Sequence, residues 1–232
     1  MKGKMISQLE LFDGIKTETL ENLIKASKVV KVPKGTFLIR AKESVATINV
    51  QLSGKSIVYN LTHEGKRKIL FVCGQGTLLN YNLLDEHFAA LYCETIESCE
   101  VLTIPIAEFE KCMESDYQLV KNMLVAQEKK VWRLCHQLKN TTSNVQMERK
   151  LVAKLWKLGR DFGFETKDGI EIDINLSITF LADMLGTSRE ATSRICSMLV
   201  EEGFIKINKK RITIVDTEKM VEFYKNGKIN IL

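Results

Sequence analysis

The stretch SITFLADMLGTSREATSRICSMLVEEG occupies residues 177–203. It predicts a short helix over Ile178–Leu185 that ends at Gly186, because glycine readily takes the left-handed conformation found just after a helix. A second helix follows, which either Thr187 or Ser188 can cap, and the spacing Thr-x-x-Glu from position 187 also matches a capping box. Two short helices joined by a tight turn that contains glycine predict a helix-turn-helix.

The sequence after this motif predicts a β-hairpin. Gly203 ends the second helix, and alternating apolar residues then predict strands over residues 204–207 and 211–215. The three residues between the strands, Asn208 to Lys210, are polar and suited to a turn. A hairpin in this place is the wing of a winged helix-turn-helix.

The polar face of the second helix carries groups that fit the edges of base pairs. Arg189 and Arg194 can each donate two hydrogen bonds to guanine, and Glu190 can accept one from cytosine. Hydroxyl groups on the same helix and cations of the wing are suited to phosphate oxygens. The predicted DNA-binding residues are Thr187, Ser188, Arg189, Glu190, Thr192, Ser193, Arg194, Lys206, Lys209, Lys210 and Arg211. In a competing interpretation, Glu190 only caps the helix and pairs with Arg189 on a solvated face.

The first hundred residues show a different sequence pattern. Residues 9–28 have apolar residues at helical spacings and predict a helix. Short β-rich runs then recur between turn signals over residues 29–104, which predicts an antiparallel sandwich or barrel. Residues 63–66 read as the tip of a hairpin, because Gly65 can take a positive φ there.

A heptad pattern follows the β-rich region. Apolar residues recur alternately four and three residues apart, with no proline or glycine over residues 113–140. This narrow stripe favours a parallel coiled coil between two copies of the chain, although a core helix packed on its own sheet is the alternative. The predicted dimer-interface residues are Met113, Tyr117, Val120, Leu124, Gln127, Val131, Leu134 and Leu138.

Three domains are expected from these segments. Residues 1–110 form an antiparallel β domain with an N-terminal helix, which the family resemblance given below implies to be a β-roll sensor domain, residues 111–139 a dimerisation helix, and residues 140–232 a winged helix-turn-helix domain. The polar run at 140–144 is a hinge between the last two, and a further helix follows it before a strand over 170–174.

Composition excludes several classes of protein. Apolar residues make up 45% of the 232 residues and charged residues 27%, which is typical of a globular protein. No apolar run approaches the roughly 18 residues that span a bilayer, and the N-terminus does not resemble a signal peptide, so a cytoplasmic protein without membrane contact is expected. The six cysteines form no C-x-x-C pair, and no metal site is predicted. No hydrolase or phosphate-loop motif is present, so the chain is not expected to be an enzyme.

With these residues in place, the chain resembles the CRP/FNR family of bacterial transcription regulators. The resemblance rests on GTSREATSRICSMLVEEGFI (186–205), DGIEIDI (168–174) and CEVLTIP (99–105). It implies an α+β fold with an N-terminal double-stranded β-helix, which is a cupin-like β-roll of the cyclic-nucleotide-binding type, then a long dimerisation helix and a C-terminal winged helix. It also implies a homodimer that binds double-stranded DNA and contacts RNA polymerase.

The resemblance also suggests an operator. Arg189, Glu190 and Arg194 are similar to the base-reading residues of the CRP branch, whereas Glu190, Ser193 and Arg194 are similar to those of the FNR branch. Because Arg189 is present, TGTGA-like half-sites in an inverted repeat are expected. Two recognition helices about 34 Å apart fit such a palindrome.

The sensor departs from its relatives. Where cyclic-AMP binders carry a Gly-Glu pair and an Arg-Ser/Thr pair, this chain has Leu79-Asn80-Tyr81 and Ala89-Ala90. Without that arginine, a buried cyclic phosphate would lack a partner, so cyclic AMP is not expected. No cofactor is predicted, and the effector is an unknown small molecule. Its candidate pocket comprises Asn80, Tyr81, Phe88, Leu91, Leu134 and Cys135. Two alternatives stay open, namely a regulator without an effector and an effector-binding module whose winged helix docks protein.

Overall fold

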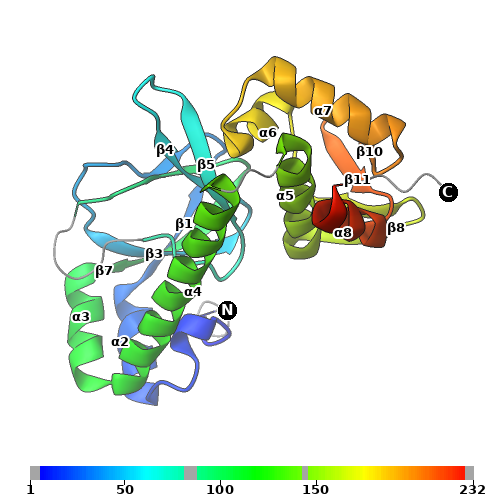
Figure 1. Ribbon diagram of the computed structural model, residues 1–232. Coiled ribbons are helices and arrows are strands. Elements are labelled where there is room, and N and C mark those ends of the chain that lie inside the picture. Colours follow the sequence, from blue (N-terminus) through cyan, green and yellow to red (C-terminus); the bar gives the residue numbers. More distant parts are fainter. Residues whose placement is uncertain (1–5, 81–87, 143–145, 228–232) are drawn as a thin grey trace. The chain divides into compact units, whose positions relative to one another are not determined.

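The computed structural model describes residues 6–80, 88–142 and 146–227. The chain divides into two compact units (Figure 1). Unit 1 comprises Met1–Thr62 and Ile69–Leu138, and unit 2 comprises His63–Lys68 and Lys139–Leu232. This division assigns most of the long helix to the unit that contains the β-rich region.

Unit 1 consists of two antiparallel sheets and their covering helices. The strands are β1 (Lys28–Val32), β2 (Phe37–Ile39), β3 (Thr47–Ser53), β4 (Ser56–Leu61), β5 (Arg67–Cys73), β6 (Tyr92–Thr95) and β7 (Cys99–Pro105). One sheet has the order β1-β7-β3 and the other β2-β6-β4-β5. The helical segments are η1 (Glu10–Phe12), α2 (Thr17–Ala26), α3 (Ile106–Ser115) and α4 (Tyr117–Thr142). The predicted antiparallel β domain followed by a long helix is confirmed.

The predicted continuous helix over residues 9–28 is wrong. The chain forms only the short turn η1 before it breaks, and α2 begins at Thr17. The break contains Gly14 at a φ of 66°, a left-handed conformation that interrupts an α-helix. The apolar spacing across the break arises because η1 and α2 both contribute side chains to the same core.

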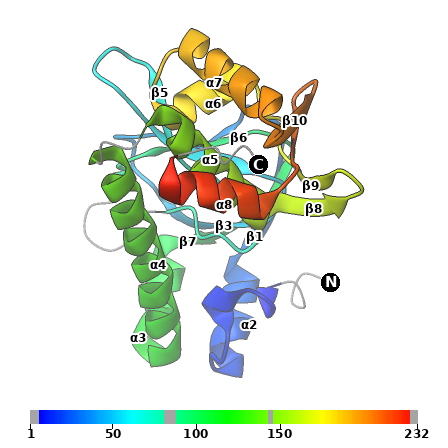
Figure 2. The ribbon, with the colours of Figure 1, turned by 45° about the vertical axis from the view of Figure 1, so that its right-hand side comes forward.

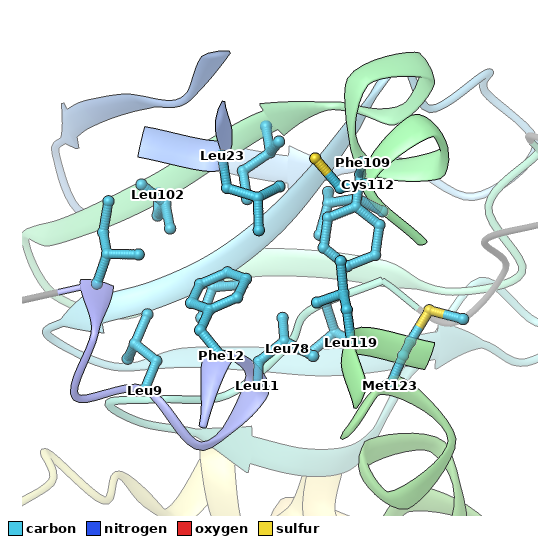
Figure 3. Close-up of a cluster of buried hydrophobic side chains, with 14 of the residues drawn as sticks. Leu9, Leu11, Phe12, Leu23, Leu78, Leu102, Phe109, Cys112, Leu119 and Met123 are labelled. Atoms are coloured by element: carbon cyan, nitrogen blue, oxygen red, sulfur yellow. The ribbon is translucent and has the colours of Figure 1, made fainter. Parts of the chain in front are cut away.

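This core is the cluster of buried side chains between the helices and the first sheet. Figure 3 shows residues of η1, α2, α3 and α4 gathered in one cluster with Leu102 of β7. Each large apolar side chain that is fully buried contributes about 1.5–3 kcal/mol to folding. From α4 the contributors are Leu119 and Met123, which lie on the face of the helix turned toward its own sheet. One face of α4 is therefore buried by contacts within its own chain.

Unit 2 contains the predicted winged helix. Its elements are α5 (Met147–Phe162), β8 (Gly163–Thr166), β9 (Gly169–Ile172), α6 (Ile178–Leu185), α7 (Arg189–Glu201), β10 (Ile205–Asn208), β11 (Arg211–Ile214) and α8 (Thr217–Asn226). The four strands form an antiparallel sheet of order β10-β11-β9-β8. The helix-turn-helix and wing strands lie where the sequence predicts them.

The sequence analysis missed two elements of unit 2. Strand β8 pairs with β9 from Gly163 to Thr166, where the sequence indicated only the end of a helix. Helix α8 packs along α5 (Figure 2). The ring of its Phe223 lies 5.1 Å from that of Phe204 between centroids, in a tilted arrangement. No helix among the described residues is long and apolar enough to cross a bilayer.

Candidate nucleic-acid interface and effector pocket

The turn between α6 and α7 has the expected geometry. Ser177 caps α6, since its Oγ accepts a hydrogen bond of 3.1 Å from the backbone N–H of Phe180. Gly186 ends the helix at a φ of 73°, which is the left-handed conformation predicted from the sequence. Only a residue without a Cβ takes this conformation at little cost, so glycine fixes the turn that orients α7.

Ser188 is the N-terminal cap of α7. Its Oγ accepts a hydrogen bond of 3.1 Å from the N–H of Ala191, so the choice left open between Thr187 and Ser188 falls on Ser188. Glu190 lies in the first turn of the helix, where a backbone N–H and the Ser188 hydroxyl lower the pKa of its carboxyl below the ordinary value. Its negative charge is also favoured there by the helix dipole.

One face of α7 is exposed and polar. Arg189, Glu190, Ser193 and Arg194 all lie on it, together with Ser197, which the sequence analysis did not single out. No ion pair within the described residues holds the guanidinium of Arg189 or Arg194, although the charges of both arginines also contribute to the lowered pKa of Glu190. The opposite face is buried and contains Ile195, Cys196 and Leu199.

Thr192 departs from its predicted role. Its side chain is fully buried, and its Oγ1 donates a hydrogen bond of 2.9 Å to the backbone oxygen of Ser188. This i−4 bond to the preceding turn is a common arrangement for threonine in a helix. The expectation that Thr192 holds a phosphate is therefore corrected, because its hydroxyl does not reach the surface.

The cations of the wing differ in whether they form ion pairs. Lys206 pairs with Asp168 at 2.6 Å between Nζ and Oδ1, and Arg211 pairs with Asp173 at 2.6 Å. Lys209 and Lys210 occupy the exposed turn, and Lys209 itself adopts a φ of 57°. The two turn lysines are thus the wing cations that carry no carboxylate partner among the described residues.

Unit 2 also contains the hairpin tip His63–Lys68. The Nζ of Lys68 donates hydrogen bonds to the carbonyl oxygens of Met184 and Leu185, at 3.2 and 2.6 Å. These carbonyls belong to the last turn of α6 and have no partner within the helix. A cation at a helix C-terminus is favoured by the helix dipole, so this lysine stabilises the end of α6.

The predicted seam on α4 divides between two faces of the helix. Tyr117, Leu124, Val131 and Leu138 are exposed, with 74%, 51%, 58% and 63% of their surface accessible. Two further apolar side chains, Val125 and Trp132, are exposed beside them. Val120, Gln127 and Leu134 of α4 are partly buried. Met113 is also partly buried but belongs to α3, because the helix predicted to run without a break from Met113 is interrupted at Asp116. Half of the predicted seam positions thus remain exposed in the single chain, whereas Met113 and Leu134 pack against its own core clusters.

The predicted effector pocket is only partly assembled. Asn80 and Leu91 line a small cavity of about 10 Å³ inside the β-roll, together with Ala89, Tyr92 and Cys93. Such a volume is room for roughly one water molecule. Leu134 does not line this cavity, but it packs against the adjoining core cluster. Tyr81 lies outside the described residues.

Two predicted pocket residues are corrected. Phe88 is 55% exposed, and its backbone forms a β-bridge with Ser44 at the surface. Cys135 is exposed on α4, one position beyond the inward-facing Leu134. Both lie away from the cavity because side chains along a helix or an extended segment diverge from one residue to the next.

The sequence analysis missed two cations near this pocket, Lys130 and Arg133 of α4. Lys130 is buried and donates a hydrogen bond from Nζ to the backbone oxygen of Asn80. The guanidinium of Arg133 lies 4.7 Å from the ring centroid of Phe71. The sequence offered a clue to both residues, because they share one helical face with Leu119, Met123 and Ala126. Cations are unexpected on a face where apolar residues recur.

The thiols of the β-roll are buried among apolar side chains. Burial raises the pKa of Cys73 to about 11 and also raises that of Cys93. Both thiols interact with the hydroxyl of Ser56, and the Cys93 Sγ lies 3.7 Å from it. Thiols that stay protonated at neutral pH are poor nucleophiles. Among the described residues, no group of three or more His, Cys, Asp or Glu side chains is placed to hold a metal ion.

Comparison with known proteins places this geometry in a family. A model of the Crp-like helix-turn-helix domain matches residues 149–223, and a model of the cyclic nucleotide-binding domain matches residues 29–116. The Global nitrogen regulator of Nostoc sp. is 30% identical over 173 residues, which cover 75% of this chain and 74% of that protein. The chain belongs to the CRP/FNR family of transcription regulators. The predicted assignment to DNA-binding regulators rather than enzymes is thereby confirmed.

Further members of the CRP/FNR family resemble the chain along most of its length. The Anaerobic regulatory protein of Bacillus subtilis is 27% identical over 204 residues, which cover 84% of this chain and 83% of that protein. The solved structure of FixK2 from Bradyrhizobium japonicum has a TM-score of 0.74 at 17% identity, and covers 84% of this chain and 96% of its own. A CooA mutant from Carboxydothermus hydrogenoformans has a TM-score of 0.71 at 20% identity, and the match covers 86% of this chain and 88% of the CooA chain. At such identities the solved structures show the shared CRP/FNR fold alone.

Proposed function

We propose that the protein is a homodimeric, cytoplasmic transcription regulator that reads an inverted-repeat operator with its two α7 helices. The observation that carries this proposal is the exposed face of α7, where Arg189, Glu190 and Arg194 lie in the first two turns. A recognition helix places such N-terminal residues against base edges in the major groove. No ion pair among the residues that the structure describes holds the guanidinium groups of Arg189 and Arg194, so these groups are available for bidentate bonds to guanine.

The exposed stripe on α4 supports the dimer. Tyr117, Leu124, Val131 and Leu138 follow one another at seven-residue intervals, which is the repeat of a helix–helix seam. Val125 and Trp132 widen this stripe. Apolar side chains at these positions would be shielded from water in a parallel pair of α4 helices, and that burial favours association.

The operator that we propose contains TGTGA-like half-sites. Arg189 and Arg194 can each recognise a guanine, and Glu190 can accept a bond from a cytosine amino group. The lysines of the wing turn, Lys209 and Lys210, add contacts to phosphates without sequence information. RNA polymerase is the proposed protein partner at the promoter, as the family resemblance implies.

The proposed effector is a small molecule other than cyclic AMP. Ala89 and Ala90 replace the Arg-Ser/Thr pair that would hold the phosphate, and the cavity beside them has a volume of about 10 Å³. A ligand of nucleotide size needs a pocket of roughly 300 Å³ or more. Both observations support a ligand other than cyclic AMP.

A gel-shift assay tests the proposed function. The duplex contains two TGTGA half-sites as an inverted repeat, about one helical turn apart between centres, and a second duplex has both half-sites scrambled. We expect Arg194→Ala to weaken binding to the first duplex by about 1–3 kcal/mol. The matched control is Arg160→Ala, which removes an exposed arginine of α5 that pairs with Asp161.

Three outcomes would contradict the proposal. Equal affinity of the wild-type protein for the two duplexes would remove the proposed half-sites. Unchanged affinity of Arg194→Ala for the operator, or an equal loss in Arg160→Ala, would remove base reading by α7. A winged helix that docks protein predicts no shift with either duplex.

A further inference from the structure

An open groove runs between helices α5 and α8 of unit 2. Its volume is about 470 Å³, and its apolar lining consists of the indole of Trp156 on α5 and the side chain of Val221 on α8. Trp156 is 36% exposed. The polar lining residues all belong to α8, namely Thr217, Glu218, Glu222, Lys225 and Asn226. An apolar floor with an accessible tryptophan and a polar rim is the composition of a surface that another segment covers.

The groove follows α8 along its length. The residues that α8 contributes come from successive turns between Thr217 and Asn226. At a rise of about 1.5 Å per residue, this stretch of helix is about 14 Å long. An extended chain advances about 3.3 Å per residue, so five residues reach about 16 Å. A short extended peptide segment therefore matches the groove in length.

The chain that follows α8 starts at one end of this groove. Residues 228–232 read Lys-Ile-Asn-Ile-Leu and lie outside the described residues. Only Gly227 separates them from Asn226, which lines the groove. In an extended segment, alternate side chains fall on one face, so Ile229 and Ile231 would share a face that Asn230 does not.

The end of α8 directs the chain out of the helix. Gly227 has a φ of 65°, and its N–H donates a hydrogen bond of 2.9 Å to the backbone oxygen of Phe223. This left-handed cap ends the helix. Arg149 of α5 holds the last carbonyls, since its Nε donates to the oxygen of Tyr224 at 2.7 Å and its Nη2 to that of Lys225 at 2.8 Å. The chain thus leaves α8 at a fixed point beside α5, from which it can turn back along the groove.

We propose that residues 228–232 dock as an extended segment in the groove between α5 and α8, with their isoleucines against Trp156 and Val221. Burial of apolar surface favours this docking. The charge of Lys228 is complementary to the carboxylates of the rim. The docking goes beyond the proposed function, because the groove shares no residue with the predicted DNA-binding set.

A docked segment would stabilise the position of α7 through α8. Helix α8 contacts the C-terminal end of α7, because the Nζ of Lys219 donates a hydrogen bond of 2.8 Å to the backbone oxygen of Glu202. The same Nζ lies 4.9 Å from the ring centroid of Phe204, which follows α7. A segment that packs on both α5 and α8 would hold α8 in the place from which it makes these contacts.

Quenching of tryptophan fluorescence by acrylamide tests the docking in the full chain without DNA. The chain has two tryptophans, so Trp132→Phe leaves Trp156 as the only one. In this background we expect the double variant Ile229→Ser and Ile231→Ser to increase quenching and to shift the emission to longer wavelengths, because the indole loses its cover. The unfolding temperature should fall by about 2–8 °C, since apolar surface is no longer buried.

Two further variants make the result specific. Asn230→Ser changes the residue between the two isoleucines, whose side chain would point out of the groove, and it should leave the quenching and the unfolding temperature unchanged. Val221→Lys places a cation in the floor of the groove and should increase the quenching of Trp156. When the isoleucine substitutions are added to Val221→Lys, they should cause no further increase, because the segment is already displaced.

The outcomes distinguish this segment from other occupants of the groove. Equal quenching of Trp156 with and without the isoleucine substitutions would overturn the docking. Docking within one chain does not depend on protein concentration. Protection of Trp156 that is lost on dilution would therefore assign the groove to a second copy and would also overturn the proposal. Every readout is taken without DNA, so failure of operator binding in the gel shift leaves this test unaffected.

Discussion

The guanidinium of Arg133 on helix α4 lies 4.7 Å from the ring centroid of Phe71 on strand β5. The ring belongs to the second core cluster of unit 1, so this contact joins the long helix to the interior of the β-roll. A cation over an aromatic face is worth about 0.5–2 kcal/mol, with the larger value for desolvated pairs. This contact therefore contributes to the stability of unit 1.

A double-mutant cycle measures this interaction. Phe71→Leu and Arg133→Gln should each destabilise the protein in urea unfolding, and together they should cost less than the sum of the two. We expect a coupling of about 0.5–2 kcal/mol. Phe109→Leu, in the other core cluster of unit 1, serves as the matched control and should show no coupling to Arg133→Gln. Additive losses in the Phe71 cycle would contradict the interaction.

The titration of Lys130 predicts a dependence of stability on pH. Burial lowers the pKa of this lysine from 10.5 to about 8. Between these values the unfolded chain holds a proton that the folded chain has released, so the contribution of Lys130 to the free energy of unfolding rises with pH. That contribution is full above pH 10.5 and is lost as the pH falls through 8.

The variant Lys130→Met isolates this effect. The difference in the free energy of unfolding between wild type and variant should grow in favour of the wild type from about pH 8 to about pH 10, the interval between the two pKa values. Cys73 acts in the opposite direction, since burial raises its pKa from 9.0 to about 11, and Lys130 holds that pKa down. The same difference is therefore measured in a Cys73→Ala background, which removes the coupling between Lys130 and Cys73. A difference that stays constant with pH would show that Lys130 titrates normally.

The outer face of α4 predicts how the dimer is weakened. Leu124→Lys places a charge in the proposed seam, where it would be desolvated next to its own counterpart. We expect the variant to elute as a monomer in size-exclusion chromatography with light scattering, while its circular dichroism stays that of the wild type. Val30→Lys changes a similarly exposed apolar residue on β1 and should remain dimeric. A dimeric Leu124→Lys protein would place the interface elsewhere.

Salt dependence separates the cations of the wing. The double variant Lys209→Ala and Lys210→Ala should reduce the slope of log affinity against log salt by about 0.9 for each phosphate that it no longer neutralises. Lys206→Ala should change the slope less, because that lysine is paired with Asp168. A filter-binding titration between about 50 and 200 mM salt measures both slopes. If Lys206→Ala has the larger effect, the ion pair with Asp168 must open on DNA.

The cap of α7 predicts a difference between neighbouring residues. Ser188→Ala removes the acceptor for the N–H of Ala191 and should destabilise the protein by about 0.5–2 kcal/mol. Thr187→Ala should cost much less in the same unfolding experiment, because the cap of α7 is the side chain of Ser188 and not that of Thr187. Equal losses would show that both residues cap the helix.

The sequence predicts the local features of the DNA-binding region because each rests on neighbours in the chain. The end of α6 at Gly186, the start of α7 and the wing strands follow from glycine conformation, capping chemistry and alternation. Local patterns say less about burial, and so Thr192 was assigned to the surface although its side chain is fully buried. A threonine can satisfy its hydroxyl on its own helix, which no pattern of exposed polar residues reveals.

The sequence by itself determined the order of elements, the helix-turn-helix and the existence of an apolar stripe on the long helix, since these depend on spacing along the chain. Only the tertiary structure decided which face of the long helix packs against the β-roll. It also decided that Lys130 and Arg133 lie on this inward face. Their partners, Asn80 and Phe71, come from positions 50 and 62 residues earlier, according to the sequence numbers. Contacts between residues so far apart depend on how sheet and helix pack, and packing leaves no mark on local periodicity.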